Sequence, residues 1–81
     1  MHYVYILQSE KDLKFYIGEA KDLEARLAYH NAGLQRSTKN RIPFRVVYYE
    51  VLNDRVEALK REKEIKSWKG GIKFKELMRG Q

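Results

Sequence analysis

The sequence contains no cysteine, no long hydrophobic run and no signal for secretion. Without cysteine, neither a disulfide framework nor a Cys-based zinc site can stabilise the fold. The longest uninterrupted apolar stretch is Tyr3 to Leu7, far too short to span a membrane. The opening residues Met1-His2-Tyr3 are not followed by the apolar region and cleavage site of a signal peptide. We therefore expect a cytoplasmic protein.

The length and composition indicate a small globular domain. The chain has 81 residues, so we expect a single domain over residues 1–81 with one modest hydrophobic core. Hydrophobic residues make up 43% of the sequence and charged residues 35%. This balance is too apolar for a disordered chain.

Positive charge is concentrated in the second part of the chain. The net charge is +6, from 17 Lys and Arg against 11 Asp and Glu. Residues 1–32 contain four basic and five acidic residues, whereas residues 33–81 contain thirteen and six. Such a surface attracts polyanions, because each neutralised phosphate of a nucleic acid releases counterions. A basic surface that only keeps the protein in solution would look the same, so charge alone leaves both interpretations open.

Three segments are typical of β-strands. Tyr3 to Leu7 is β-branched and aromatic, and we expect it to be buried on both faces. Lys14 to Ile17 is a second strand, which Gly18 would end. Phe44 to Leu52 is a third strand, with Pro43 at its start.

The first two strands are expected to form a hairpin. A four-residue loop at Ser9–Asp12 would place Tyr5 opposite Tyr16 and Tyr3 opposite Gly18. Both Tyr5 and Tyr16 would then stand on the same face of the sheet.

A first helix is expected after Asp22, which is a good N-cap residue. Leu23 and Leu27 give this helix an apolar stripe, and Gly33 can end it as the residue after the C-cap. The polar segment from Gly33 to Pro43 contains no acidic residue and is expected to be a loop.

A long second helix is expected from Asp54 to about Trp68. Asp54 followed by Glu57 is a capping box, and Gly70-Gly71 would end the helical region before a short last helix over Ile72–Met78. The predicted order is ββαβαα, an α+β domain with a small three-stranded antiparallel sheet flanked by helices.

Glu62 is the residue of the second helix that packing explains least. At 100° per residue, Ala58, Leu59 and Ile65 define one apolar arc, and Glu62 falls inside it. An ionised carboxylate in a stripe that faces the core is costly unless a cation or a donor meets it. Its partner could be a basic side chain, as in most structural ion pairs, or a divalent metal.

Arg26 and His30 lie four residues apart on one face of the first helix. An Arg there can bind a phosphate through two hydrogen bonds, and the His can move a proton near neutral pH. Each feature also has a purely structural explanation. An isolated pair of this kind is more often an exposed Arg beside a partly buried His, and Tyr is a good strand residue. Together with Tyr5, Tyr16 and Glu62, however, the pair supplies the groups that phosphodiester hydrolysis requires.

Four ordered motifs resemble the GIY-YIG nuclease superfamily, over essentially the whole chain. They are Val4-Tyr5-Ile6, Tyr16-Ile17-Gly18, Asp22-Leu23-x-x-Arg26-Leu27-x-x-His30 and Glu57-Ala58-Leu59-x-x-Glu62. The sequence looks most similar to small stand-alone bacterial members and, more distantly, to the nuclease domain of the bacterial excinuclease. The resemblance implies a metal-dependent DNA endonuclease that acts in repair or recombination.

The resemblance also implies a role for individual residues. Glu62 would hold a Mg²⁺ or Mn²⁺ ion, and Tyr5 or Tyr16 would be the general base for an attacking water. Arg26 would neutralise the transition-state phosphate, and His30 would assist proton movement or position a phosphate.

Other residues are expected to contact DNA. Gly18 would let the backbone approach the substrate closely. Basic side chains of the loop and of the Lys-rich run Lys60–Lys75 would bind the DNA backbone without reading bases, and those of the loop are Arg36, Lys39, Arg41 and Arg45. Glu19, directly after Gly18, is an acid that could repel phosphate or alter metal binding.

Two other functions fit the same residues. A nucleic-acid-binding module on this scaffold could have lost efficient cleavage, and a protein–protein module could carry its basic surface for solubility alone. Binding that weakens steeply with salt would distinguish the first from the second.

Overall fold

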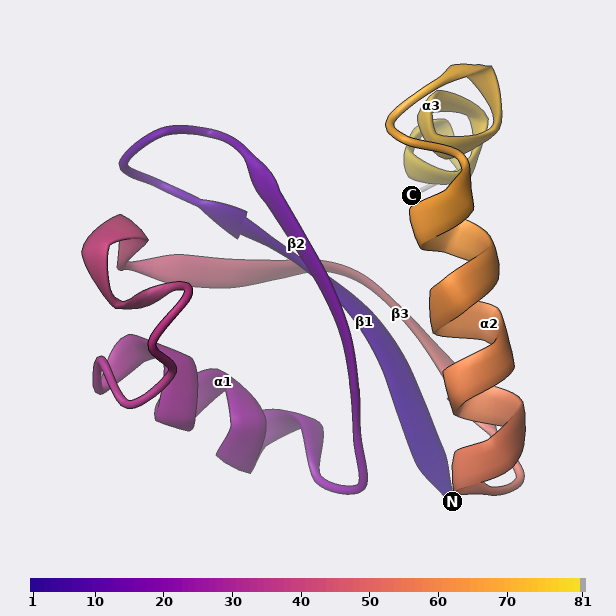
Figure 1. The fold of residues 1–81 in the computed structure, drawn as a ribbon, viewed down its shortest axis with the longest axis horizontal. Coiled ribbons are helices and arrows are strands. Elements are labelled where there is room, and N and C mark those ends of the chain that lie inside the picture. Colours follow the sequence, from indigo (N-terminus) through magenta and orange to yellow (C-terminus); the bar gives the residue numbers. More distant parts are fainter. Residues whose placement is uncertain (81) are drawn as a thin grey trace.

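The computed structural model describes residues 1–80, which form a three-stranded sheet and three α-helices (Figure 1). The elements, in chain order, are β1 (His2–Ser9), β2 (Phe15–Ala20), α1 (Leu23–Asn31), a 3₁₀ turn (Lys39–Arg41), β3 (Phe44–Leu52), α2 (Arg55–Ser67) and α3 (Ile72–Arg79). The sheet is antiparallel in the order β2-β1-β3. The predicted α+β class and the ββαβαα order are therefore confirmed. No helix within residues 1–80 is long and apolar enough to cross a membrane.

The central strand β1 is buried on both of its faces, as predicted. Val4 and Ile6 point to the side covered by α2 and α3, and Tyr5 and Leu7 point to the side covered by α1. All four are at most 1% exposed. Figure 1 shows α1 and α2 on opposite sides of the sheet. The alternation of side chains along β1 thus supplies two small cores from one strand.

The first two helices begin where their N-cap residues were expected. The Asp22 carboxylate accepts the N–H of Ala25 at 3.0 Å, and the Asp54 carboxylate accepts the N–H of Glu57 at 2.9 Å. These caps satisfy N–H groups that the first turn of a helix leaves without partners. Gly33 follows α1 with a φ of +76°, a conformation that favours glycine.

The β1–β2 hairpin differs from its predicted register by two residues. Tyr5 lies opposite Gly18, and Leu7 lies opposite Tyr16, so the predicted pairing of Tyr5 with Tyr16 is wrong. Because the shift is an even number of residues, each side chain keeps its face, and Tyr5 and Tyr16 still share one face of the sheet.

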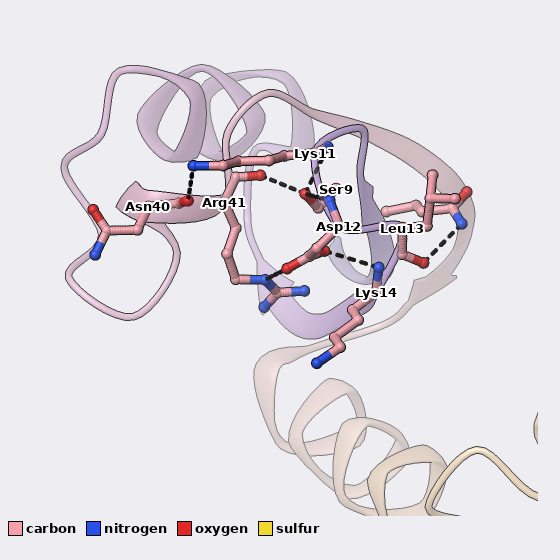
Figure 2. Close-up of polar contacts among 8 residues, drawn as sticks. Ser9, Lys11, Asp12, Leu13, Lys14, Asn40 and Arg41 are labelled. Atoms are coloured by element: carbon pink, nitrogen blue, oxygen red, sulfur yellow. Dashed lines mark hydrogen bonds and ion pairs between the residues drawn. The ribbon is translucent and has the colours of Figure 1, made fainter.

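Hydrogen bonds of the hairpin loop account for the shift. Ser9 stays in β1, and its hydroxyl accepts the N–H groups of Lys11 and Asp12, both at 3.1 Å. The same hydroxyl donates to the carbonyl of Arg41 at 2.5 Å (Figure 2). The loop therefore extends beyond Asp12, and Leu13 takes a positive φ of 62°. The segment around Arg41 also forms a 3₁₀ turn, which the sequence predicted only as loop.

Gly18 lies within β2 and does not end it, contrary to the prediction. The strand continues to Ala20, and the Tyr5 ring occupies the space beside the glycine. A Cβ atom at Gly18 would lie 2.5 Å from the Tyr5 hydroxyl oxygen and 2.7 Å from Cζ. Both distances are shorter than real Cβ contacts, so only glycine leaves Tyr5 in this position.

The apolar arc of α2 is narrower than predicted. Ala58 and Ile65 are fully buried against Val4, Ile6 and Phe74, but Leu59 is 42% exposed. Polar contacts also attach α2 to the sheet. The single Nε–H of Arg61 is shared between both oxygens of the Glu50 carboxylate of β3, at 2.9 and 3.1 Å, and Nη2 donates to the same carboxylate at 2.8 Å.

The close fit around Gly18 generates a stability prediction. Gly18→Ala should lower the free energy of unfolding by about 1–3 kcal/mol, because overpacking a filled core forces side chains out of place. Gly80→Ala is the matched control, since a Cβ there meets its nearest atom at an ordinary 3.5 Å. Urea unfolding of both variants measures the difference. Equal stability of the two would contradict the packing described for Tyr5.

Candidate active site

The two predicted site tyrosines, Tyr5 and Tyr16, lie side by side on the face of the sheet that α1 covers. Their ring centroids are 6.5 Å apart. Tyr5 is 1% exposed, whereas Tyr16 is only partly buried. Tyr5 comes from the central strand and Tyr16 from the edge strand β2, which explains the difference.

His30 lies at the centre of this group and is fully buried. Its Nε2 is 3.3 Å from the Tyr5 hydroxyl oxygen, and its ring packs edge-on against Tyr16 at 4.9 Å between centroids. On the other side of the ring, Nδ1 lies 2.9 Å from the Thr38 hydroxyl oxygen. Both ring nitrogens therefore have a partner.

Hydrogen bonds of the neighbouring residue Asn31 attach the end of α1 to the sheet. Its side-chain amide donates to the carbonyl of Phe44 at 3.0 Å, and its side-chain oxygen accepts the Phe44 N–H at 2.7 Å. These two bonds fix the end of α1 to the start of β3. His30 is consequently held against the sheet at the last turn of its helix.

Arg26 lies one turn before His30 on α1 and is exposed. Its guanidinium lies over the ring of Tyr29, 5.3 Å from the centroid. The structure thus brings Arg26 to the rim of the tyrosine–histidine group, where an anion from solvent could reach it.

The pKa values of Tyr5 and His30 reflect this environment. Burial raises the pKa of Tyr5, the nearby Tyr16 raises it further, and the positive charge of Arg26 opposes the shift. Burial also lowers the pKa of His30, and Arg26 lowers it further. At neutral pH we therefore expect a neutral phenol next to a neutral imidazole.

Glu62 comes from α2, the helix that covers the other side of the sheet. Its side chain is 16% exposed and pairs with Lys66, one turn later, at 2.5 Å between Nζ and Oε2. The basic partner considered from the sequence is thus present. The negative charges of Glu62 and Glu19 both raise the pKa of Tyr5. Both carboxylates therefore lie near enough to act on the phenol electrostatically.

The charge of Glu19 is partly balanced by Arg55, and His2 adds a hydrogen bond or, when protonated, a second positive charge. Its carboxylate lies 2.7 Å from Nε2 of His2 and 3.8 Å from Nε of Arg55. Repulsion of phosphate by Glu19 would therefore be weaker than that of a free carboxylate.

A divalent ion would have few protein ligands here. Within residues 1–80, no group of three or more His, Cys, Asp or Glu side chains is arranged to hold a metal. Mg²⁺ commonly binds through only one or two carboxylates, with water and substrate phosphate completing its shell. The largely shielded Glu62 carboxylate, with one exposed Lys as its partner, fits that mode of binding and does not fit a closed structural metal site.

The predicted DNA-contacting residues of the loop divide into two kinds. Arg36 and Lys39 are exposed and take part in no ion pair within the described part of the chain. Arg41 donates to the Asp12 carboxylate at 2.8 Å (Figure 2), and Arg45 donates to the side chain of Gln8 at 3.0 Å. Among the contacts within residues 1–80, Arg36 and Lys39 have no side-chain partner to give up when they bind DNA.

Sequence reasoning missed Thr38 as part of this site. Thr38 is fully buried and contacts His30 across the loop that follows α1. The sequence offered no signal for it, because a Thr in a polar loop is ordinary and only the folded loop brings it back to the helix.

Comparison with known proteins identifies a matching family model and several similar sequences. Residues 1–75 match the family model described as the GIY-YIG catalytic domain. The chain is 44% identical over 80 residues to a UPF0213 protein of Staphylococcus saprophyticus, covering 98% of this chain and 96% of that protein. It is 44% identical over 75 residues to a UPF0213 protein of Staphylococcus haemolyticus, covering 91% and 90%.

A solved structure agrees with these sequence matches. The solution NMR structure of a UPF0213 protein from Bacillus halodurans superposes with a TM-score of 0.56 and 32% sequence identity. The match covers 98% of this chain and 82% of that one. The resemblance seen in the motifs is confirmed, and this chain belongs to the GIY-YIG catalytic domain family as a small member similar to the UPF0213 proteins.

Proposed function

We propose that this protein is an endonuclease that hydrolyses phosphodiester bonds in DNA, uses Mg²⁺ or Mn²⁺, and acts in repair or recombination. Membership of the GIY-YIG family suggests a nuclease. The observation that carries the proposal is the group formed by Tyr5, His30 and Arg26, in which a phenol, a proton acceptor and a cation lie together. The excess of basic residues in the second part of the chain supports binding to a polyanion.

Tyr5 is the better placed of the two candidate bases. Hydrolysis requires that a water proton leaves as the new P–O bond forms, and that the departing oxygen gains a proton, here from solvent, as the old bond breaks. The Tyr5 hydroxyl oxygen can accept the water proton while its own proton passes to Nε2 of His30, 3.3 Å away. A neutral His30 makes this transfer possible, whereas Tyr16 has only an edge-on ring contact with the imidazole.

Arg26 and Glu62 supply the charges that the reaction needs. Arg26 is exposed and can donate two hydrogen bonds to the phosphate oxygens on which charge develops. Glu62 would hold the divalent ion, which when bound would neutralise negative charge on the phosphate. Lys66 would be displaced from the carboxylate or would shift toward the DNA backbone, and its exposed position on α2 allows this.

The first prediction of this proposed function concerns the charges of Arg26 and Glu62. Glu62→Gln and Arg26→Ala should each lower the single-turnover rate of DNA cleavage in Mg²⁺ or Mn²⁺ by about 100-fold or more, the size of effect seen when one transition-state contact is removed. Matched controls are Glu76→Gln and Arg79→Ala on α3, away from the site. These controls should cleave at the wild-type rate.

The assay should use branched, supercoiled and linear DNA, so that each common form of the substrate is covered. Failure of the wild-type protein to cleave any of them in either metal would refute the nuclease proposal. If binding to DNA remained tight in that case, the protein would be a nucleic-acid-binding module on the same scaffold.

The second prediction concerns the basic loop. Replacing both Arg36 and Lys39 with Ala should reduce the dependence of log Kd on log salt by about 1–2, since each phosphate contact contributes about 0.9. Fluorescence anisotropy of labelled DNA across a salt series measures this slope. Arg79→Ala serves as the single-charge control, and an unchanged slope in the double variant would remove this loop from the interface.

A further inference from the structure

A buried chain of hydrogen bonds begins at Tyr5 and passes through His30 and Thr38. The chain runs from the Tyr5 hydroxyl to Nε2 of His30 at 3.3 Å, and from Nδ1 of His30 to the Thr38 hydroxyl at 2.9 Å. It continues from the Thr38 hydroxyl to the carbonyl of Gln35 at 3.4 Å. Thr38 and His30 are 0% exposed and Tyr5 is 1% exposed, so Tyr5 is the one side chain of the three that keeps a small area open to solvent.

The two ends of this chain favour one direction for the hydrogen bonds in it. The Gln35 carbonyl can only accept, and it also accepts the backbone N–H groups of Thr38 at 3.1 Å and Lys39 at 2.9 Å. When the Thr38 hydroxyl donates to this carbonyl as well, it has a lone pair left for His30. Nδ1 of His30 must then carry the proton and donate to Thr38. A neutral imidazole has one N–H, so Nε2 is left with a free lone pair that accepts the proton of the Tyr5 hydroxyl.

The opposite direction of hydrogen bonding leaves one buried group, the Tyr5 hydroxyl, without an acceptor. If Thr38 donated to Nδ1, the imidazole proton would lie on Nε2 and would point at the Tyr5 oxygen. The Tyr5 hydroxyl hydrogen would then have no acceptor within the described residues, where His30 is the one hydrogen-bond partner of that hydroxyl. A buried hydroxyl without an acceptor is costly, which favours the first direction.

We propose that Thr38 is a positioning residue that keeps the proton of His30 on Nδ1, and so leaves Nε2 free to accept the phenolic proton of Tyr5. Thr38 does not touch the substrate and acts through His30. The structural part of this proposal stands alone, and its catalytic part rests on the proposed nuclease function. In that reaction, the Tyr5 O–H bond breaks as the oxygen gains the water proton, and a new N–H bond forms at Nε2.

The structural part is tested by NMR of the full chain. Only two histidines are present, and comparison with His2→Gln assigns the ring ¹⁵N signals of His30. We expect the wild-type signals at neutral pH to show a protonated Nδ1 and an unprotonated Nε2. A proton on Nε2 in the wild type would overturn the proposal at once, whether or not the protein cleaves DNA.

Variants of Thr38 test which residue sets this tautomer. Thr38→Val keeps the shape of the side chain and removes the hydroxyl, and should move the proton of His30 to Nε2 or give a mixture of tautomers. Thr38→Ser keeps the hydroxyl and should retain the wild-type signals. Thr38→Ala takes the place of Thr38→Val if the valine variant does not fold. An unchanged tautomer in the folded variant without a hydroxyl would overturn the role of Thr38.

Cleavage measurements test the catalytic part. Thr38→Val should lower the single-turnover rate by about 100-fold without changing DNA affinity, the size expected when a proton-transfer partner is lost, and Thr38→Ser should restore the rate. A wild-type rate in Thr38→Val with an altered tautomer would refute the catalytic part. Absence of cleavage by the wild type would refute the proposed function and also the catalytic part, while the NMR result would still decide the structural part.

Discussion

The whole structure depends on the burial of strand β1 on both faces. Its side chains alternate between the core under α1 and the core under α2 and α3, so one strand contributes to both cores. This arrangement has a cost at Tyr5, because a hydroxyl is carried into an apolar interior and must find a partner there. His30 is that partner, and Thr38 in turn satisfies His30. The polar group that we propose for catalysis thus follows from the packing of the central strand.

The same constraint accounts for the glycine in β2. Gly18 lies opposite Tyr5, and the absence of its side chain leaves the space that the phenol fills. The family resemblance suggested a different role for this glycine, close approach of the backbone to the substrate, which stays a prediction. Packing alone requires glycine here, so the loss of function in a Gly18 variant would not separate the two roles.

Most of the fold could be predicted from local features of the sequence. The N-caps at Asp22 and Asp54, the β-branched run in β1 and the glycines after α1 and α2 are signals that act within a few residues, and each helix and strand was found. The hairpin register was not found, because the side-chain hydrogen bonds of Ser9 and its contact with Arg41 depend on the folded loop. Leu59 was wrongly placed in the core, since helical periodicity gives a direction and does not show how far the sheet extends beneath it.

Most residues of the candidate site could likewise be predicted from the sequence, whereas some of its contacts could not. Tyr5, Tyr16, Arg26, His30 and Glu62 were all chosen from residue type, spacing and family resemblance. The structure adds the direct contact of Tyr5 with His30 and the ion pair of Glu62 with Lys66. Thr38 could not have been chosen, because its importance arises from a contact between a loop and a helix eight residues apart in sequence.

The most direct test of the central claim compares two tyrosine variants in one single-turnover cleavage assay. The account predicts that Tyr5→Phe, which keeps the buried ring and removes only the hydroxyl, lowers the cleavage rate by about 100-fold and leaves DNA affinity unchanged. Tyr16→Phe should retain far more activity, since its ring contact with His30 does not depend on the hydroxyl. Cleavage at the wild-type rate by Tyr5→Phe would contradict the assignment of the proton-transfer site to Tyr5 and His30.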